Sequence, residues 1–390
     1  MSDLNKFYAN WNYPTNIRQG IGRINKLPQY CKELAMKAPL LITDLDLAKL
    51  PMISEARDNC IKQGLYCEVF SDVVSNPTDK NVNDGVIAYG HGNHDGVIAF
   101  GGGSAIDAAK AVALMVGQKG TLWDYEDVGS NWTRVSEQGM APVVAIPTTA
   151  GTGAEVGRAS VITDPEHHVK RIIFHPKMLP EMVILDAELT LGLPTKLTAA
   201  TGMDAFSHAL EAYCSNYYHP MAEGIALEAM RLIKNYLPRA TKQGGDIEAR
   251  AQVMVASTMG ATAFQRGLGG MHALAHSLGA LYNSHHGLLN AILMPFVLRA
   301  NQTAIESRIE RLGRYLQLTN LNFEGFLRWV IELREEIGIP ATLAEIDIDD
   351  QQAQLIGEMA IKDSTAGGNP IQFTADEYSV IFKNAVTGKL

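Results

Sequence analysis

Two segments of this 390-residue chain combine an aspartate and several histidines at spacings that could hold a metal ion. Asp204 and His208 are four residues apart, and His272 and His276 repeat that spacing later in the chain, followed by the pair 285–286. Side chains four residues apart lie on one face of a helix. One carboxylate and several imidazoles on apolar helices suit a divalent cation such as Fe²⁺, Zn²⁺, Mn²⁺, Co²⁺ or Ni²⁺. Each histidine alone could instead be hydrogen-bonded in a core, and it is the combination that favours a metal.

A glycine-rich segment, Gly101-Gly102-Gly103-Ser104, follows an apolar run and precedes a predicted helix. Glycines at this position let a pyrophosphate approach the backbone, and the helix N-terminus offers oriented N–H groups. The segment has neither the GxGxxG spacing nor the Gly-Lys-Ser/Thr ending of a P-loop. On its own it could also be a tight strand-to-helix turn that binds nothing.

A second loop, residues 147–155, follows the next apolar run and carries the hydroxyls of Thr148, Thr149 and Thr152. In open α/β sheets, ligands bind at the C-terminal ends of the strands. Two such loops in one sheet therefore strengthen the prediction of a ligand-binding site. Asp44 ends an earlier strand, where a carboxylate can accept hydrogen bonds from a ribose and repel a 2′-phosphate. As a lone residue, Asp44 is also typical of a turn.

The elements that would position these loops alternate along the first half of the chain. The pattern predicts strands at 39–44, 66–70, 96–100 and 142–147, and helices at 47–64, 82–93 and 105–116. Alternation of strands and helices predicts a parallel sheet covered on both faces.

From about residue 195 the strand patterns stop. The sequence predicts helices at 197–214, 222–237, 247–264 and 271–282, and further helices from 288 to 390. We therefore expect an α/β domain over residues 1–193 and an all-helical domain over residues 194–390, with a hinge at 193–195.

Composition excludes several classes of protein. There are 33 Lys and Arg against 42 Asp and Glu, a net charge of −9, which argues against a nucleic-acid binder. The segment 267–298 contains no Asp, Glu, Lys or Arg, but its histidines, asparagines and Pro295 argue against a lipid-facing helix. The four cysteines form no CxxC pair, and residues 1–6 do not begin a signal peptide. We expect reduced thiols and a cytoplasmic protein that does not contact membranes.

Taken together, these segments resemble the iron-containing (group III) alcohol dehydrogenases, which are related to glycerol dehydrogenase and dehydroquinate synthase. The matching segments run in family order, with compatible flanks. They are Gly101–Lys110, Pro147–Glu155, Ala200–Glu211, His272–Gly279 and His286–Gly287.

The resemblance implies roles for individual residues. The four implied metal ligands are Asp204, His208, His272 and His286. His276 matches a histidine that lies near substrate and nicotinamide rather than on the metal. The implied cofactor contacts are Gly102, Gly103, Ser104 and Asp107 in the diphosphate loop, Thr148, Thr149 and Thr152 in the second loop, and Asn76 and Lys170 elsewhere. Asp44 matches the acid that favours NAD over NADP.

The same resemblance implies a dehydroquinate synthase-like fold: an N-terminal Rossmann-like α/β domain with a parallel sheet and an all-α C-terminal domain. It implies a homodimer or larger homo-oligomer, a bound Fe²⁺ with Zn²⁺ as the alternative, and hydride transfer between an alcohol or aldehyde and NAD(H). The metal would polarise the substrate oxygen, and His276 could relay a proton. The chain departs from the family at His285, where members often have Pro, which adds a polar group to the expected substrate pocket.

Two other functions fit the same fold. A lyase of the dehydroquinate synthase type would need Lys and Arg for a phosphate leaving group, and the segment 267–298 has none. A non-catalytic relative would not need every ligand position intact. The sequence leaves the substrate open among short primary alcohols, diols, hydroxy acids and sugar-derived aldehydes.

Overall fold

The computed structural model describes residues 15–167 and 169–390, so residues 1–6 and the start of the predicted first domain lie outside the described residues. The described chain forms two compact units. The α/β unit contains the described residues up to Thr149 together with Gly153–Gly192, and the helical unit contains Ala150–Thr152 and Leu193–Leu390.

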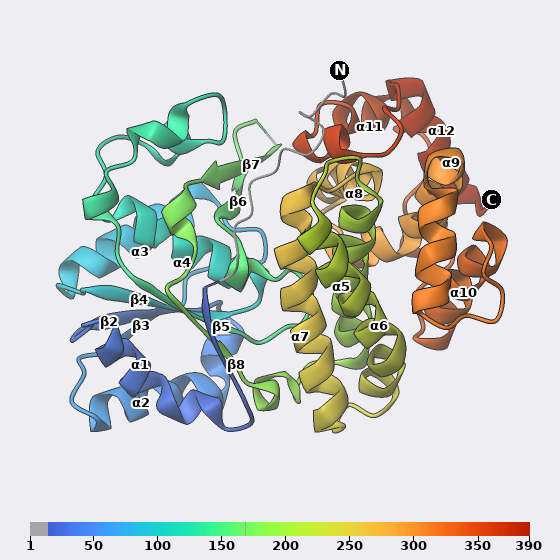
Figure 1. The fold of residues 1–390 in the computed structure, drawn as a ribbon. Coiled ribbons are helices and arrows are strands. Elements are labelled where there is room, and N and C mark those ends of the chain that lie inside the picture. Colours follow the sequence, from blue (N-terminus) through green and yellow to red (C-terminus); the bar gives the residue numbers. More distant parts are fainter. Residues whose placement is uncertain (1–14, 168) are drawn as a thin grey trace, which may run out of the picture. The chain divides into compact units, whose positions relative to one another are not determined.

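Six parallel strands form the sheet of the α/β unit, in the order β1-β8-β5-β4-β2-β3, and β6 and β7 form a separate antiparallel hairpin (Figure 1). The strands are β1 (Asn16–Gln19), β2 (Pro39–Ile42), β3 (Glu68–Phe70), β4 (Gly96–Gly101), β5 (Val143–Pro147), β6 (Ala159–Asp164), β7 (Val169–Phe174) and β8 (Met182–Leu185). The helices are α1 (Leu27–Glu33), α2 (Pro51–Lys62), α3 (Asp79–His91) and α4 (Gly103–Met115).

Helices cover both faces of this sheet. On one face, alternate residues of the strands, among them Leu41, Ile98 and Val144, share a buried core with side chains from α1 and α2. On the other face lie α3 and α4 (Figure 1), and every residue of α4 from Ala105 to Met115 is buried. Because both faces are covered, β2, β4 and β5 read as continuous apolar runs. The predicted parallel sheet is confirmed.

Several predicted boundaries were wrong. The helix predicted over 47–64 is a 3-10 turn, Leu47–Lys49, followed by α2, because Leu50 is extended (ψ 144°) and Pro51 can only begin a new helix. The helix predicted from 82 begins at Asp79, because Thr78 and Asn81 form a capping box. The sequence interpretation missed β1, β6, β7 and β8.

The helical unit confirms the predicted change from α/β to all-α structure. Its helices are α5 (Thr195–Cys214), α6 (Pro220–Lys242), α7 (Ile247–Ala263), α8 (Gly270–Tyr282), α9 (His286–Tyr315), α10 (Phe323–Glu336), α11 (Ala353–Ala360) and α12 (Ala375–Thr387). Helix α5 packs against α6, α7 and α9, and α8 packs against α9. Among the described residues, no helix is both long and apolar enough to cross a bilayer.

Candidate metal centre and nucleotide-binding loops

The structure brings the four predicted ligands together in the helical unit. Each offers a ligand atom within 4.8 Å of the others. Three are buried, and only the imidazole of the last is partly exposed. We call this set the ligand cluster: Asp204 and His208 on α5, His272 on α8 and His286 at the start of α9.

Close helix packing allows this convergence. A Cβ atom on Gly287 would lie 2.5 Å from the carbonyl oxygen of Ala200 and 2.9 Å from Cβ of Asp204, so only glycine fits there. The first turn of α9 can therefore lie directly against α5. As a result, Nε2 of His286 is 3.6 Å from Oδ1 of Asp204.

The protonation states of the cluster favour cation binding. Burial lowers the pKa of His272 well below its ordinary value, so its imidazole is neutral and keeps a lone pair. Burial alone would raise the pKa of Asp204, but the imidazoles of the cluster and the Asn290 amide outweigh it and lower that pKa to about 2. An ionised carboxylate beside a neutral imidazole is the state in which such ligands bind a metal.

Two buried polar atoms at the ligand cluster lack hydrogen-bond partners among the described residues. Within the described part of the chain, Nδ1 of His208 and Oδ1 of Asn290 are buried without a hydrogen-bond partner. Buried polar atoms normally have partners, and exceptions often mark a missing ion or water. The donor set of one carboxylate oxygen and three imidazole nitrogens therefore fits a divalent first-row cation.

His276 lies beside the cluster. Its Nδ1 is 2.9 Å from Oδ2 of Asp363, and its ring stacks on His286 at 5.1 Å and 17°. An ionised carboxylate can only accept, so this contact places a proton on Nδ1, and in the neutral form of the ring Nε2 is the acceptor. The His276 side chain is 21% exposed.

His285, the departure from the family pattern, caps a helix. It is exposed and precedes α9, and its Nδ1 accepts a hydrogen bond from the backbone N–H of Leu288 at 3.4 Å. It is absent from the ligand cluster.

The predicted cofactor residues of the α/β unit gather at the C-terminal ends of its strands. Gly102 precedes the first residue of α4, and a Cβ atom on it would lie 3.5 Å from the Thr149 side chain. The backbone N–H of Thr148 donates to the carbonyl of Gly101 at 3.0 Å. The two loops are therefore neighbours, as the sequence interpretation requires.

Two more predicted contacts lie beside the glycine loop. The hydroxyl of Ser104 donates to the carbonyl of Ser75, which places the neighbouring Asn76 next to the loop. A Cβ atom on Gly101, whose φ of +156° favours glycine, would lie 3.7 Å from Oδ2 of Asp44. Oδ1 of Asp44 accepts hydrogen bonds from the backbone of the following turn, so the other oxygen faces the loop.

Three other predicted cofactor residues, Asp107, Lys170 and Thr152, have surroundings that the sequence interpretation did not predict. The carboxylate of Asp107 is buried, accepts from the backbone N–H of Val161 at 3.0 Å and lies 3.1 Å from Nζ of Lys110. Burial raises its pKa in spite of this partner. Lys170 lies on β7, and burial lowers its pKa while Asp107 acts to raise it. Thr152 belongs to the helical unit, unlike the other two threonines of its loop.

Sequence reasoning missed three residues of the site: Glu211, Asn290 and Asp363. Glu211 follows Asp204 by seven residues and His208 by three, so helical spacing could have identified it. Asn290 follows His286 by four residues and could have been found in the same way. Asp363 is 87 residues from His276, and no local pattern connects them.

Two family models match the chain. One, described as "Iron-containing alcohol dehydrogenase", matches residues 14–187. The other, "Fe-containing alcohol dehydrogenase family, C-terminal", matches residues 198–386.

Similar proteins cover almost the whole chain. The 4-hydroxybutyrate dehydrogenase of Cupriavidus necator is 36% identical, over 94% of this chain and 97% of its own. The NAD-dependent methanol dehydrogenase of Bacillus methanolicus is 35% identical, with the same two coverages. A crystal structure of 1,3-propanediol oxidoreductase matches with a TM-score of 0.92 and 33% identity, over 97% of this chain and 100% of that one. A sulfoacetaldehyde reductase from Bifidobacterium kashiwanohense in complex with NAD⁺ matches with a TM-score of 0.89 and 26% identity, over 97% and 99%.

Proposed function

The chain belongs to the iron-containing alcohol dehydrogenase family, and we propose that it interconverts short primary alcohols and their aldehydes with NAD(H). The ligand cluster carries this proposal, because one carboxylate and three imidazoles converge there from α5, α8 and α9. A bound cation would supply Lewis-acid polarisation of the substrate oxygen. We propose Fe²⁺ as that cation, with Zn²⁺ as the alternative that the same donors accept.

His276 is the proposed proton relay. Because Asp363 holds its Nδ1–H, its Nε2 can accept a proton from an alcohol and return it during aldehyde reduction. The stacked His286 ring fixes the plane in which that nitrogen lies. Asp363 thus orients the proposed relay.

NAD supplies the hydride chemistry, and the α/β unit supplies its binding site. The proposed diphosphate contacts are the backbone N–H groups at the start of α4, where the helix dipole favours negative charge. Thr148, Thr149, Thr152, Asn76 and Lys170 are proposed as further contacts. We also propose the domain division 1–193 and 194–390, a homo-oligomer and a cytoplasmic location.

Relatives suggest the substrate class. They act on 4-hydroxybutyrate, methanol and 1,3-propanediol, according to their names, and each of these carries a primary hydroxyl. We propose that this chain likewise acts on a primary hydroxyl at the end of a short chain.

The test is an NADH assay with protein loaded with Fe²⁺ or Zn²⁺. Short primary alcohols, diols and ω-hydroxy acids are supplied with NAD, and secondary alcohols serve as controls. We expect NADH to accumulate with primary alcohols only, and chelation to abolish it. A lyase of the dehydroquinate synthase type would form no net NADH, and a non-catalytic relative would bind NAD without turnover.

Asp44→Gly should weaken the preference for NAD. A carboxylate at the adenosine ribose would face the 2′-phosphate of NADP, and two unit charges about 4 Å apart at an effective dielectric of about 20 interact by roughly 4 kcal/mol. A quarter of that repulsion, about 1 kcal/mol, corresponds to about a fivefold preference, since about 1.4 kcal/mol is tenfold. We expect wild type to favour NAD in kcat/KM by about fivefold or more, and the variant to narrow or invert the ratio. Equal kcat/KM values for both cofactors in wild type would show that Asp44 does not face the ribose.

A further inference from the structure

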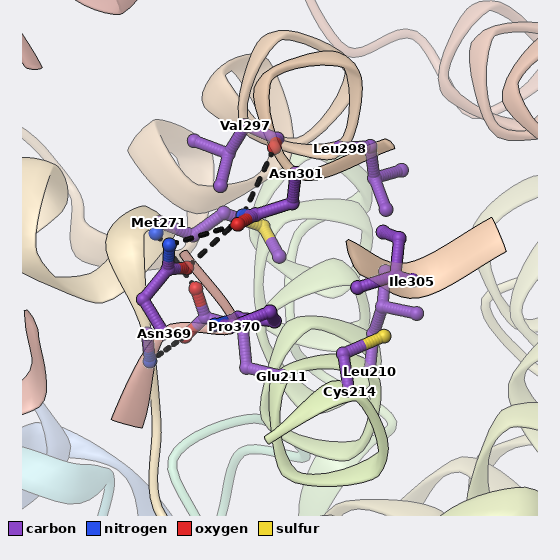
Figure 2. Close-up of a pocket in the computed structure, with 11 residues that line it drawn as sticks. Leu210, Glu211, Cys214, Met271, Val297, Leu298, Asn301, Ile305, Asn369 and Pro370 are labelled. Atoms are coloured by element: carbon purple, nitrogen blue, oxygen red, sulfur yellow. Dashed lines mark hydrogen bonds between the residues drawn. The ribbon is translucent and has the colours of Figure 1, made fainter. Parts of the chain in front are cut away.

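Glu211 is a buried carboxylate behind the ligand cluster. It lies on α5, one turn after His208, and is 5% exposed. Its Oε1 accepts from the backbone N–H of Met271 at 2.7 Å, and its Oε2 accepts from that of Gly269 at 2.8 Å. Figure 2 shows Glu211 and Met271 on the wall of one small cavity. Both oxygens are thus engaged by N–H donors at the start of α8.

The same carboxylate contacts a ligand histidine. Oε2 of Glu211 is 2.7 Å from Nδ1 of His272, and the His272 side chain is 1% exposed. Burial raises the pKa of Glu211 to about 7, and above that pH the ionised carboxylate can only accept, so Nδ1 of His272 carries the proton. This contact alone predicts the Nδ1–H tautomer for the neutral ring.

A contact on the opposite side of the ring leads to the same tautomer. Nε2 of His272 is 3.2 Å from Nδ2 of Asn290, and that nitrogen is also 2.9 Å from Oδ1 of Asp204. The contact with the Asp204 carboxylate fixes the amide orientation, because a carboxylate cannot donate to a carbonyl. The second hydrogen of this amide lies between Nε2 of His272 and Nε2 of His286, which is 3.1 Å away. A donor therefore faces Nε2 of His272, and this contact favours Nε2 as the acceptor, with its lone pair directed into the cluster.

We propose that Glu211 is a positioning residue that locks His272 in the Nδ1–H tautomer and so presents its Nε2 lone pair to the cation. The other tautomer would place a hydrogen where the ligand cluster needs a donor atom. A carboxylate behind a ligating imidazole also holds the ring orientation and raises its basicity, and losing such a partner costs about 10- to 100-fold in metal affinity. The step from tautomer to metal affinity rests on the proposed function.

Glu211 also caps α8, so a variant needs a matched control. Asn369 serves, because its Oδ1 accepts from the backbone N–H of Gly270 at 3.0 Å in the same helix turn. Its side-chain amide also exchanges two hydrogen bonds with that of Asn301. Figure 2 shows Asn369 beside Glu211. No hydrogen bond joins Asn369 to His272 within the described residues. Asn369→Ala therefore removes a cap of α8 and leaves the histidine contact in place.

The experiment measures tautomers in metal-free protein and then cation affinity. Long-range ¹H–¹⁵N spectra of ¹⁵N-histidine-labelled protein, assigned by comparison with His272→Ala, report which ring nitrogen is protonated. Wild type and Asn369→Ala should both show protonated Nδ1 on His272. Glu211→Gln should show a mixture or the reverse, because one amide oxygen cannot accept from all three donors. Competition titrations with Co²⁺ should then show about 10- to 100-fold weaker binding for Glu211→Gln and unchanged binding for Asn369→Ala.

Three results would overturn the proposal. Protonated Nε2 on His272 in wild type would do so without any variant. Wild-type tautomer and affinity in Glu211→Gln would show that the carboxylate positions nothing, and an equal loss of affinity in Asn369→Ala would reduce its role to helix capping. Failure of wild type to bind any divalent cation would instead contradict the proposed metal site, while the tautomer spectra would still decide the role of Glu211.

Discussion

His272→Ala is expected to lose its bound metal and at least about a hundredfold in kcat, because removing even a residue behind a ligand costs about 10- to 100-fold. The wild-type imidazole is buried and neutral, so it supplies a lone pair without competition from protons. Alanine has no ligand atom, and a water molecule in its place would not be held in a fixed position as the imidazole is held by α8. NAD binding should survive, because the glycine loop lies in the other unit. Metal content, NAD affinity and turnover of the purified variant are the measurements.

His285 and His286 provide the matched control for that experiment. His286→Ala should behave like His272→Ala, because its Nε2 lies beside Asp204 in the ligand cluster. His285→Ala should keep its metal, because that imidazole is exposed and caps α9. Metal loss in His285→Ala but not in His286→Ala would move the ligand by one position. Stoichiometric metal and full turnover in His272→Ala would refute the ligand cluster itself.

Local spacing made one pair of the ligand cluster predictable, and the family resemblance implied the full set with His272 and His286. A separation of four residues on a helix fixes relative position before any tertiary contact forms, and this holds for Asp204 with His208. Glu211 lies on the same helix face, so spacing alone would have included it. A glutamate on a helix is usually exposed to solvent, however, so the residue type did not indicate a buried site residue. Asp363 reaches His276 only through the packing of the C-terminal segments, which no periodicity encodes.

The sheet was predictable where strands are buried on both faces. β2, β4 and β5 are continuous apolar runs, whereas β1 is a four-residue strand with polar residues at the sheet edge. The exception is β8, which is also a fully buried apolar run and was nevertheless missed. The β6–β7 hairpin is only partly buried: β6 alternates between buried and half-buried residues, and β7 has one buried residue, so neither strand is a buried apolar run. The position of the hairpin depends on a charged side chain whose burial could not be predicted from the sequence.

That charge is Lys110 on α4, whose side chain is 1% exposed. Its ammonium donates to the carbonyl of Ala154 at 2.9 Å and to that of Ala159, and it pairs with Asp107 at 3.1 Å. Asp107 in turn accepts from the backbone N–H of Val161. One buried ion pair therefore ties the helix behind the glycine loop to the first strand of the hairpin that carries Lys170.

Lys110→Met is expected to lower the free energy of unfolding by about 3–5 kcal/mol, since removing one partner leaves the other buried charge uncompensated. The carbonyls of Ala154 and Ala159 would also lose their donor. Asp107→Asn/Lys110→Met is the control: with both charges gone, it should be more stable than Lys110→Met alone, and urea unfolding measures all three proteins. Because α4 begins at the glycine loop, Lys110→Met should weaken NAD binding more than it weakens metal binding in the other unit. A loss below about 1 kcal/mol, the size of an ordinary point substitution, would show that the ammonium does not hold the hairpin.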